Sequence, residues 1–192
     1  TLPLPPEPTA HSGLDALCQA IEAYVSRGAN PVSDLWALRA VRAIGGSLAG
    51  AVADGSNRGH RYDMALGSHL AGLALASARL GLVHGLAHPV GMASGKPHGL
   101  VCGAMLPMVI RANAEAAGSR YGDLCEAAGL GSPEPAAAAE ALARWVEGLC
   151  EEFGAPVRLA ELGVPEDELE SIATAAASAG STRTNPLEMS AE

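Results

Sequence analysis

The chain has 192 residues, of which 48% are hydrophobic and 17% charged, and 12 basic against 21 acidic residues give it a formal net charge of −9. This composition excludes a disordered chain, which needs low hydrophobicity and high charge. The acidic balance argues against nucleic-acid binding. Lys96 is the single lysine, so there is no polybasic patch for a membrane surface. No unbroken apolar stretch approaches the length of about 18 residues that a membrane span needs.

Residues 1–10 are rich in proline and do not begin with methionine. Because Thr1-Leu-Pro-Leu-Pro-Pro carries no basic region, we expect no signal peptide. We interpret residues 1–10 as the remnant of a linker between two domains. The four cysteines (Cys18, Cys102, Cys125 and Cys150) form no CxxC pair. They predict reduced thiols packed as small hydrophobes, and hence a reducing, cytoplasmic compartment.

The composition predicts an all-α fold. Alanine is abundant and aromatic residues are only 3%, whereas strands favour aromatic and β-branched residues. Apolar periodicity and cap or stop signals predict a multi-helix bundle in one domain, residues 1–192. The expected helices run from a cap at Ser12 to about Gly28, over about 33–53, about 61–80, a short stretch after Gly81, from about His98 through Pro107, about 119–128, about 132–153, and from Val164. Residues after Ala179 are expected to form a loop.

Three histidines, His84, His88 and His98, lie close together in the sequence. Neutral imidazole is a common ligand for iron and zinc, although a buried histidine is more often a hydrogen-bonded part of a core. His84 and His88 are four residues apart and therefore share a helical face. Spacing alone would make these two the ligand pair, with His98 returning after a Gly/Pro-rich turn.

A polar stripe lies on the first long helix, where Asp15, Gln19 and Glu22 are spaced at i, i+4 and i+7. Such stripes are usually the solvated face of an amphipathic helix. The alternative is a carboxylate presented to a site between helices. One Asp with two His would suit a divalent cation and leave a coordination position open for substrate.

Taken together, these motifs resemble the C-terminal domain of the iron-containing (group III) alcohol dehydrogenases. The resemblance runs nearly end to end. It rests on Gly13-Leu-Asp-Ala-Leu-Cys-Gln-Ala-Ile-Glu-Ala-Tyr24, Leu70-Ala-Gly-Leu-Ala74, His84-Gly-Leu-Ala-His-Pro89, Pro97-His-Gly99, Leu106-Pro107 and Asn185-Pro186. It implies an NAD(P)-dependent oxidoreductase of two domains, of which this chain would be the all-helical domain that carries the metal site.

The resemblance also implies roles for single residues. Asp15, His84 and His98 map to metal ligands, and His88 maps to a polar or proton-relay residue of the catalytic cleft. This mapping replaces the His84/His88 pair that spacing alone favoured. Where the family pattern has a fourth ligand, a histidine, this chain has Gln19. A glutamine oxygen can ligate, but it is neutral and harder than imidazole and should weaken iron binding. The expected cofactor is therefore Fe²⁺ or Zn²⁺, with loss of the metal as the alternative.

The second departure from the family is the absence of a nucleotide-binding domain. The chain shows no glycine-rich loop after a strand and no βαβ unit, so no residue is assigned to the nucleotide cofactor. We expect NAD(P) to bind only together with an N-terminal domain, and the chain alone to be inactive. The expected reaction interconverts a small alcohol and its aldehyde or ketone. The alternative is a non-catalytic helical binding or oligomerisation module or a degenerate remnant of the family, and homo-oligomer formation is left open.

Overall fold

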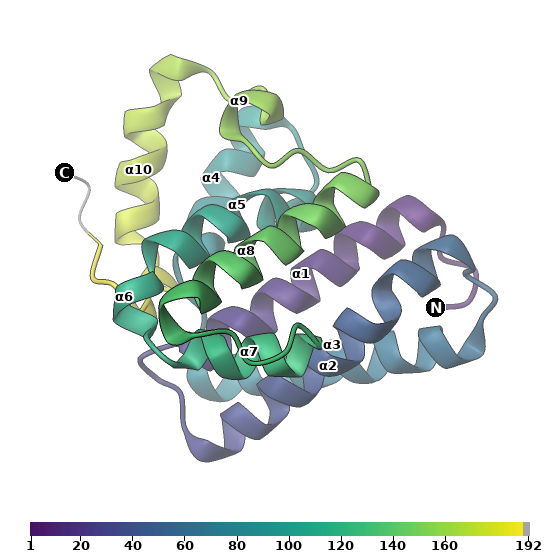
Figure 1. Cartoon of the computed structure of the whole chain (residues 1–192). Helices are drawn as coiled ribbons and strands as arrows, with labels where there is room; N and C mark the ends of the chain where they lie inside the picture. Colours follow the sequence, from purple (N-terminus) through teal and green to yellow (C-terminus); the bar gives the residue numbers. More distant parts are fainter. Residues whose placement is uncertain (190–192) are drawn as a thin grey trace.

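The computed structural model describes residues 1–189 and contains helices but no strand within them, which confirms the all-α fold (Figure 1). The α-helices are α1 Pro6–Val25, α2 Pro31–Ala53, α3 Arg58–Ala78, α4 Leu82–Ser94, α5 His98–Ala112, α6 Ala114–Ala117, α7 Arg120–Ala128, α8 Pro135–Glu152, α9 Leu159–Leu162 and α10 Leu169–Ser178. Two 3₁₀ turns, Glu166–Glu168 and Thr182–Thr184, flank α10.

Helix α1 is the centre of the bundle. It packs against α2 and α3 on one side and against α5 on the other, and it also contacts α7 (Figure 1). Thirteen of its 20 residues are buried, including Leu14, Leu17 and Ile21. Any polar side chain on its inner face is therefore held at a fixed place between helices.

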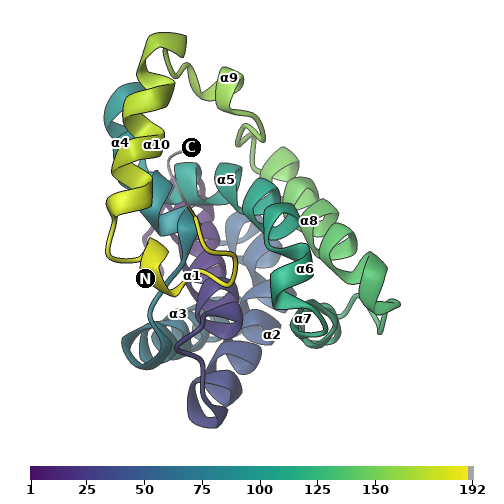
Figure 2. The same ribbon diagram turned by 90° about the vertical axis from the view of Figure 1, so that its left-hand side faces the viewer.

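A second layer covers α1 from the other side. Helix α5 packs against α4 and α8, and α10 lies alongside α4 (Figure 2). The segment after α10 returns to the start of α4, where the buried Asn185 accepts a hydrogen bond from the backbone N–H of Leu82 (3.1 Å) and donates one to the amide oxygen of Asn113 (2.8 Å). These bonds fix where α4 begins, two residues before His84.

The first helix begins earlier than expected, at Pro6 instead of after Ser12. Proline is well tolerated in the first turn of a helix and an acidic residue there favours the helix dipole, and Pro6 and Glu7 provide both. The hydroxyl of Ser12 donates to the carbonyl of Pro8 inside the helix (2.7 Å) and does not cap it. Only residues 1–5 precede the helix, so the second half of the predicted linker 1–10 is helical.

The shortest elements were not predicted. Helices α6 and α9 have four residues each, too few to show a periodic pattern, and the loop expected after Ala179 contains the turn Thr182–Thr184. Among residues 1–189, no single helix is both long and apolar enough to cross a membrane; α3 and α4 would meet that test only as a pair, bent by 109°.

Candidate metal centre

Three helices bring four possible ligands to one point. Helix α1 carries Asp15, α4 carries His84, and α5 carries His98 at its first residue and Cys102 one turn later. One donor atom from each of the four lies within 4.8 Å of all the others. The sequence assigned Asp15, His84 and His98 to one site, and the structure does bring these three residues together.

A glycine allows the start of α5 to touch α1. A Cβ atom on Gly99 would lie only 2.1 Å from the backbone oxygen of His11 and 3.3 Å from the Cβ of Asp15. No residue larger than glycine fits there without moving one of the helices. This contact brings Nε2 of His98 to 3.5 Å from Oδ1 of Asp15.

Glu22 fixes the orientation of the His84 ring. Its carboxylate is 3% exposed; one oxygen accepts the backbone N–H of Val83 (2.6 Å) and the other lies 2.6 Å from Nδ1 of His84. Nδ1 therefore carries its proton towards Glu22, and Nε2 points to Asp15. Carboxylate–histidine pairs of this kind set the tautomer and direction of metal-binding histidines.

Two buried polar atoms face each other without a hydrogen-bond partner among the described residues. They are Oδ1 of Asp15 and Nε2 of His84, 3.3 Å apart. Buried polar atoms are nearly always paired, so positive charge belongs between these two atoms, carried either by a proton on His84 or by a bound cation. Nitrogen and carboxylate oxygen donors suit zinc and iron, and the residues present therefore fit the divalent metal that the family resemblance implies.

The electrostatics of the cluster also favour a cation. Burial would lower the pKa of His84, but the carboxylates of Asp15 and Glu22 raise it to about 10. Burial would likewise raise the pKa of Asp15, but the nearby imidazoles of His84 and His98 hold it below its usual range. The two carboxylates thus create a field that stabilises positive charge between α1 and α4.

Gln19 and His88 contact the site differently. The amide nitrogen of Gln19 donates to Oδ2 of Asp15 (3.0 Å), so its side chain orients the carboxylate. His88 is exposed and lies outside the four-residue cluster. The pairing of His84 with His88 that spacing favoured is therefore wrong, because α4 packs with only His84 facing Asp15.

Two hollows flank His98. One, of about 460 Å³, lies between α1 and the start of α5 and is lined by Asp15, His98 and His11. The other, of about 210 Å³, is lined by His88, Lys96 and His98. The His98 ring, whose side chain is 52% exposed, is thus accessible from both hollows.

Sequence reasoning missed Glu22 as the partner of His84 and Cys102 as a member of the cluster. Glu22 was noted only as part of a polar stripe that is usually solvated, but it is buried. Its position seven residues after Asp15, on the same helix face, was the available signal. Cys102 was interpreted as a small hydrophobe, although it follows His98 by four residues and thus shares its helix face.

Comparison with known proteins agrees with this geometry. The model of the C-terminal part of the Fe-containing alcohol dehydrogenase family matches residues 9–192. The chain belongs to the Fe-containing alcohol dehydrogenase family. The lactaldehyde reductase of Escherichia coli K12 is 37% identical over 192 residues, covering 98% of this chain and 50% of that protein. The 1,3-propanediol dehydrogenase of Klebsiella pneumoniae is 40% identical over 181 residues, 93% of this chain and 46% of that protein.

Solved structures of this family share the fold. A 1,3-propanediol oxidoreductase superimposes with a TM-score of 0.95 at 37% identity, over 100% of this chain and 50% of that chain. The maleylacetate reductase of Rhizobium sp. strain MTP-10005 superimposes with a TM-score of 0.82 at 26% identity, over 100% and 51% of the two chains. The chain therefore spans about half the length of the relatives it matches.

Proposed function

We propose that this chain is the metal- and substrate-binding half of an NAD(P)-dependent alcohol dehydrogenase that interconverts a small alcohol and its aldehyde or ketone. The observation that carries the proposal is the pair of unpartnered buried atoms, Oδ1 of Asp15 and Nε2 of His84, beside His98. Glu22 holds the His84 ring so that Nε2 faces Asp15, and His98 brings a third donor to the same point, a convergence that suits a bound cation.

In this proposal Asp15, His84 and His98 hold the metal, and Gln19 supports it indirectly. Sequence reasoning had included Gln19 among the ligands. Its amide N–H is bonded to Oδ2 of Asp15, and turning the amide over would place its oxygen against that carboxylate oxygen. Gln19 therefore keeps Asp15 aimed at the metal position and adds no ligand atom. Glu22 does the same for His84.

When bound, the metal supplies Lewis-acid chemistry that polarises an alcohol or carbonyl oxygen. The remaining work falls to side chains of this chain. Asp15 contributes negative charge that retains the cation, and the hollow beside His98 receives the substrate. His88 is exposed beside His98 and Lys96, where an imidazole can pass a proton between the cleft and water.

The relatives support a proposal for the partners, and the cysteines support one for the compartment. Several are named for small alcohols or aldehydes, and one is named an NAD-dependent methanol dehydrogenase. Because this chain spans about half of them, we infer that a nucleotide-binding half supplies the NAD(P) site. The four cysteines are buried free thiols, which supports the reducing cytoplasm as its compartment.

A fusion to the N-terminal half of the E. coli lactaldehyde reductase tests this function. With 1,3-propanediol and NAD⁺, the fusion should reduce NAD⁺ only when metal is present. His98→Ala should lower turnover by at least about 100-fold, because even residues behind the ligands change activity by 10–100-fold. Unchanged turnover in His98→Ala would refute the metal role, and no turnover from a metal-loaded fusion would favour the non-catalytic alternative.

A further inference from the structure

Cys102 lies on the buried side of the cluster, and nothing in the proposed three-ligand centre uses it. It is fully buried, and its Sγ lies 3.5 Å from Nε2 of His98. The same Sγ is within 4.8 Å of the donor atoms of Asp15 and His84. Because residues four apart share a helix face, His98 and Cys102 reach the same point from consecutive turns of α5.

We propose that Cys102 is the fourth protein ligand of the metal and that its thiolate makes the site selective for Zn²⁺ over Fe²⁺. The proposal rests on the metal centre proposed above, and it assigns to that centre a ligand and a class of metal. Since Gln19 is bonded to Asp15, no other side chain in the cluster offers a fourth donor among the described residues.

Of the six distances between the four donor atoms, three agree with tetrahedral coordination, and the other three are each no more than 4.8 Å. Ligand atoms bound to zinc at about 2.0–2.3 Å in a tetrahedron lie about 3.3–3.6 Å from one another. Oδ1 of Asp15 lies 3.3 Å from Nε2 of His84 and 3.5 Å from Nε2 of His98. Nε2 of His98 lies 3.5 Å from Sγ of Cys102. Adjacent ligands of an octahedral ion with bonds of about 2.1 Å would lie only about 3.0 Å apart.

Charge balance and ligand softness also favour zinc coordination by Cys102. The carboxylate of Asp15 and a thiolate at Cys102 together balance the charge of a divalent ion, which matters because Cys102 is fully buried. On binding, the S–H bond of Cys102 breaks, its proton leaves to solvent, and an Sγ–metal bond forms without change of oxidation state. Thiolate and imidazole together are typical zinc ligands.

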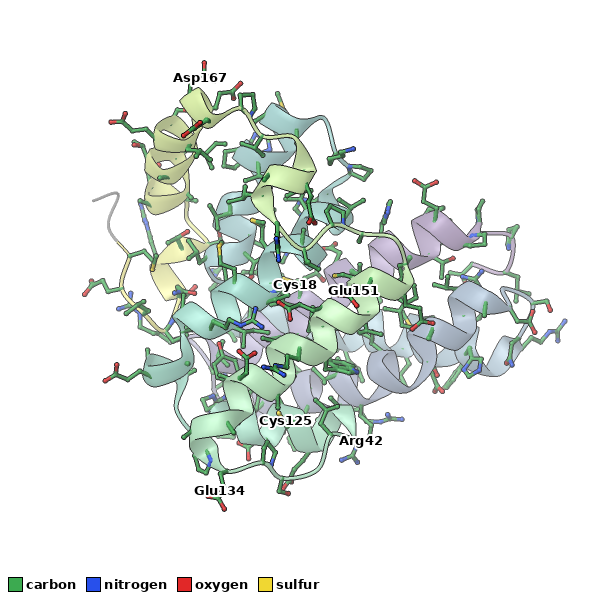
Figure 3. The ribbon with its side chains drawn as sticks, turned by 45° about the horizontal axis from the view of Figure 1, so that its top comes forward. Cys18, Arg42, Cys125, Glu134, Glu151 and Asp167 are labelled. Carbon is green, nitrogen blue, oxygen red and sulfur yellow. The ribbon has the colours of Figure 1, made fainter. Side chains whose placement is uncertain are left out.

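Cys18 is also buried near the cluster, inside the bundle (Figure 3), but it is placed for a different role. Its Sγ lies 3.9 Å from Nδ1 of His84, the ring nitrogen that is already hydrogen-bonded to Glu22. Cys18 also lies outside the group of four residues whose donor atoms converge on the proposed metal position. Cys18 is therefore a matched control, a buried cysteine beside the site that is not a ligand.

Cobalt(II) substitution of the full chain tests the proposal, because thiolate-to-cobalt charge transfer gives a near-ultraviolet band and four-coordinate cobalt gives intense visible bands. The wild type and Cys18→Ser should both show the charge-transfer band. Cys102→Ser should still bind cobalt but lose that band, and its Zn²⁺ affinity should fall more than about tenfold, since even outer-shell changes cost that much. Cys102→Ala provides a second variant if serine disturbs folding, which circular dichroism reports.

The outcomes separate the two proposals. Cobalt bound by the wild type without a charge-transfer band, or a band that survives in Cys102→Ser and Cys102→Ala, overturns the role of Cys102 and leaves the three-ligand centre standing. Failure of the folded wild type to bind cobalt, zinc or iron overturns the metal centre and Cys102 as its ligand together.

Discussion

Glu22 lies outside the cluster of Asp15, His84, His98 and Cys102, yet its two carboxylate oxygens decide which nitrogen of His84 faces Asp15. One oxygen accepts the N–H of Val83 and the other binds the Nδ1 side of the ring. A residue of this kind is invisible to motif reasoning based on ligand types alone, because carboxylates on amphipathic helices are usually solvated.

We expect Glu22→Gln to weaken metal binding by about 10–100-fold. A glutamine has one amide oxygen, so it cannot accept hydrogen bonds from both the Val83 N–H and Nδ1 of His84. When its oxygen accepts from Val83, its NH₂ group faces Nδ1 of His84. The His84 ring then adopts the tautomer with its proton on Nε2, where the metal should bind. Titration with Zn²⁺ measures the effect, and Glu152→Gln, at the exposed end of α8, is the control. Equal affinity in Glu22→Gln and wild type would contradict the orienting role.

Substitution of His88, unlike that of Glu22, should lower turnover without affecting metal binding. Because it is exposed and outside the ligand cluster, His88→Ala should leave metal content unchanged. In the fusion with a nucleotide-binding half, its turnover should fall by about tenfold or more, since general acid–base groups contribute at least that. Loss of metal from His88→Ala would show that it is a ligand after all.

The sequence predicts the three principal site residues through the family resemblance, whereas their arrangement depends on tertiary packing. From spacing, His84 and His88 are equivalent members of one helix face. Which of them meets Asp15 depends on where α4 starts, and that point is set by Asn185, more than 100 residues away along the chain. No local pattern contains this information.

At the scale of helices, the site depends on the close contact between α1 and α5. Three of the four cluster residues, Asp15, His98 and Cys102, lie on these two helices. The contact is possible because Gly99 has no side chain next to the backbone of His11. The glycine was visible in the sequence as part of Pro97-His-Gly99, but the partner it contacts was not.

Gly99→Ala should separate the two helices and damage the site. Its Cβ would collide with the backbone oxygen of His11, and overpacking of this kind costs about 1–3 kcal/mol. Urea unfolding should show that loss, and metal affinity should fall with it. Gly72→Ala on α3, where nothing lies within 4 Å of the new Cβ, should instead stabilise by about 0.5–1 kcal/mol. Equal stability of the two variants would refute the close-contact argument.

The contact between α5 and α8 should depend on pH. Arg111 on α5 bridges Glu140 and Glu147 on α8, and hydrogen bonds from Arg111 lower the pKa of Glu140 to about 2. A depressed carboxyl pKa stabilises the fold above pH 4.5, and this contribution disappears as the pH falls through about 2.

The stability difference between wild type and Glu140→Gln should therefore be largest near neutral pH and shrink as the pH falls below 4.5. Urea unfolding across this range measures it. Glu152→Gln, at the end of α8 and without an ion pair among the described residues, should show no such trend. A difference that grows on acidification would contradict the ion-pair interpretation.

For the whole molecule, composition was sufficient for the fold class. Abundant alanine and few aromatic residues predicted an all-α chain, and residues 1–189 contain no strand. The long helices were predicted because their apolar faces repeat over many turns, as in α2 and α8. The start of α1 was placed too late because proline was taken as a linker signal, although it also begins helices.

The metal centre connects α1, α4 and α5, so metal and fold should stabilise each other. A ligand that binds only the folded state adds about 4 kcal/mol at a concentration 1,000 times its dissociation constant. The sequence alone could not predict this coupling between metal and fold, because the coupling depends on distances between side chains far apart in the chain. Asp15 precedes His84 by 69 residues and Cys102 by 87 residues.

The most direct test is the metal content of the chain after anaerobic incubation with iron or zinc and removal of free metal, measured by mass spectrometry for wild type, His98→Ala and His69→Ala. His69 lies on α3, outside the cluster. We expect close to one metal per chain in wild type and His69→Ala, and a large loss in His98→Ala. Equal metal content in wild type and His98→Ala, or no metal in any of the three folded proteins, would contradict a metal centre built from Asp15, His84 and His98.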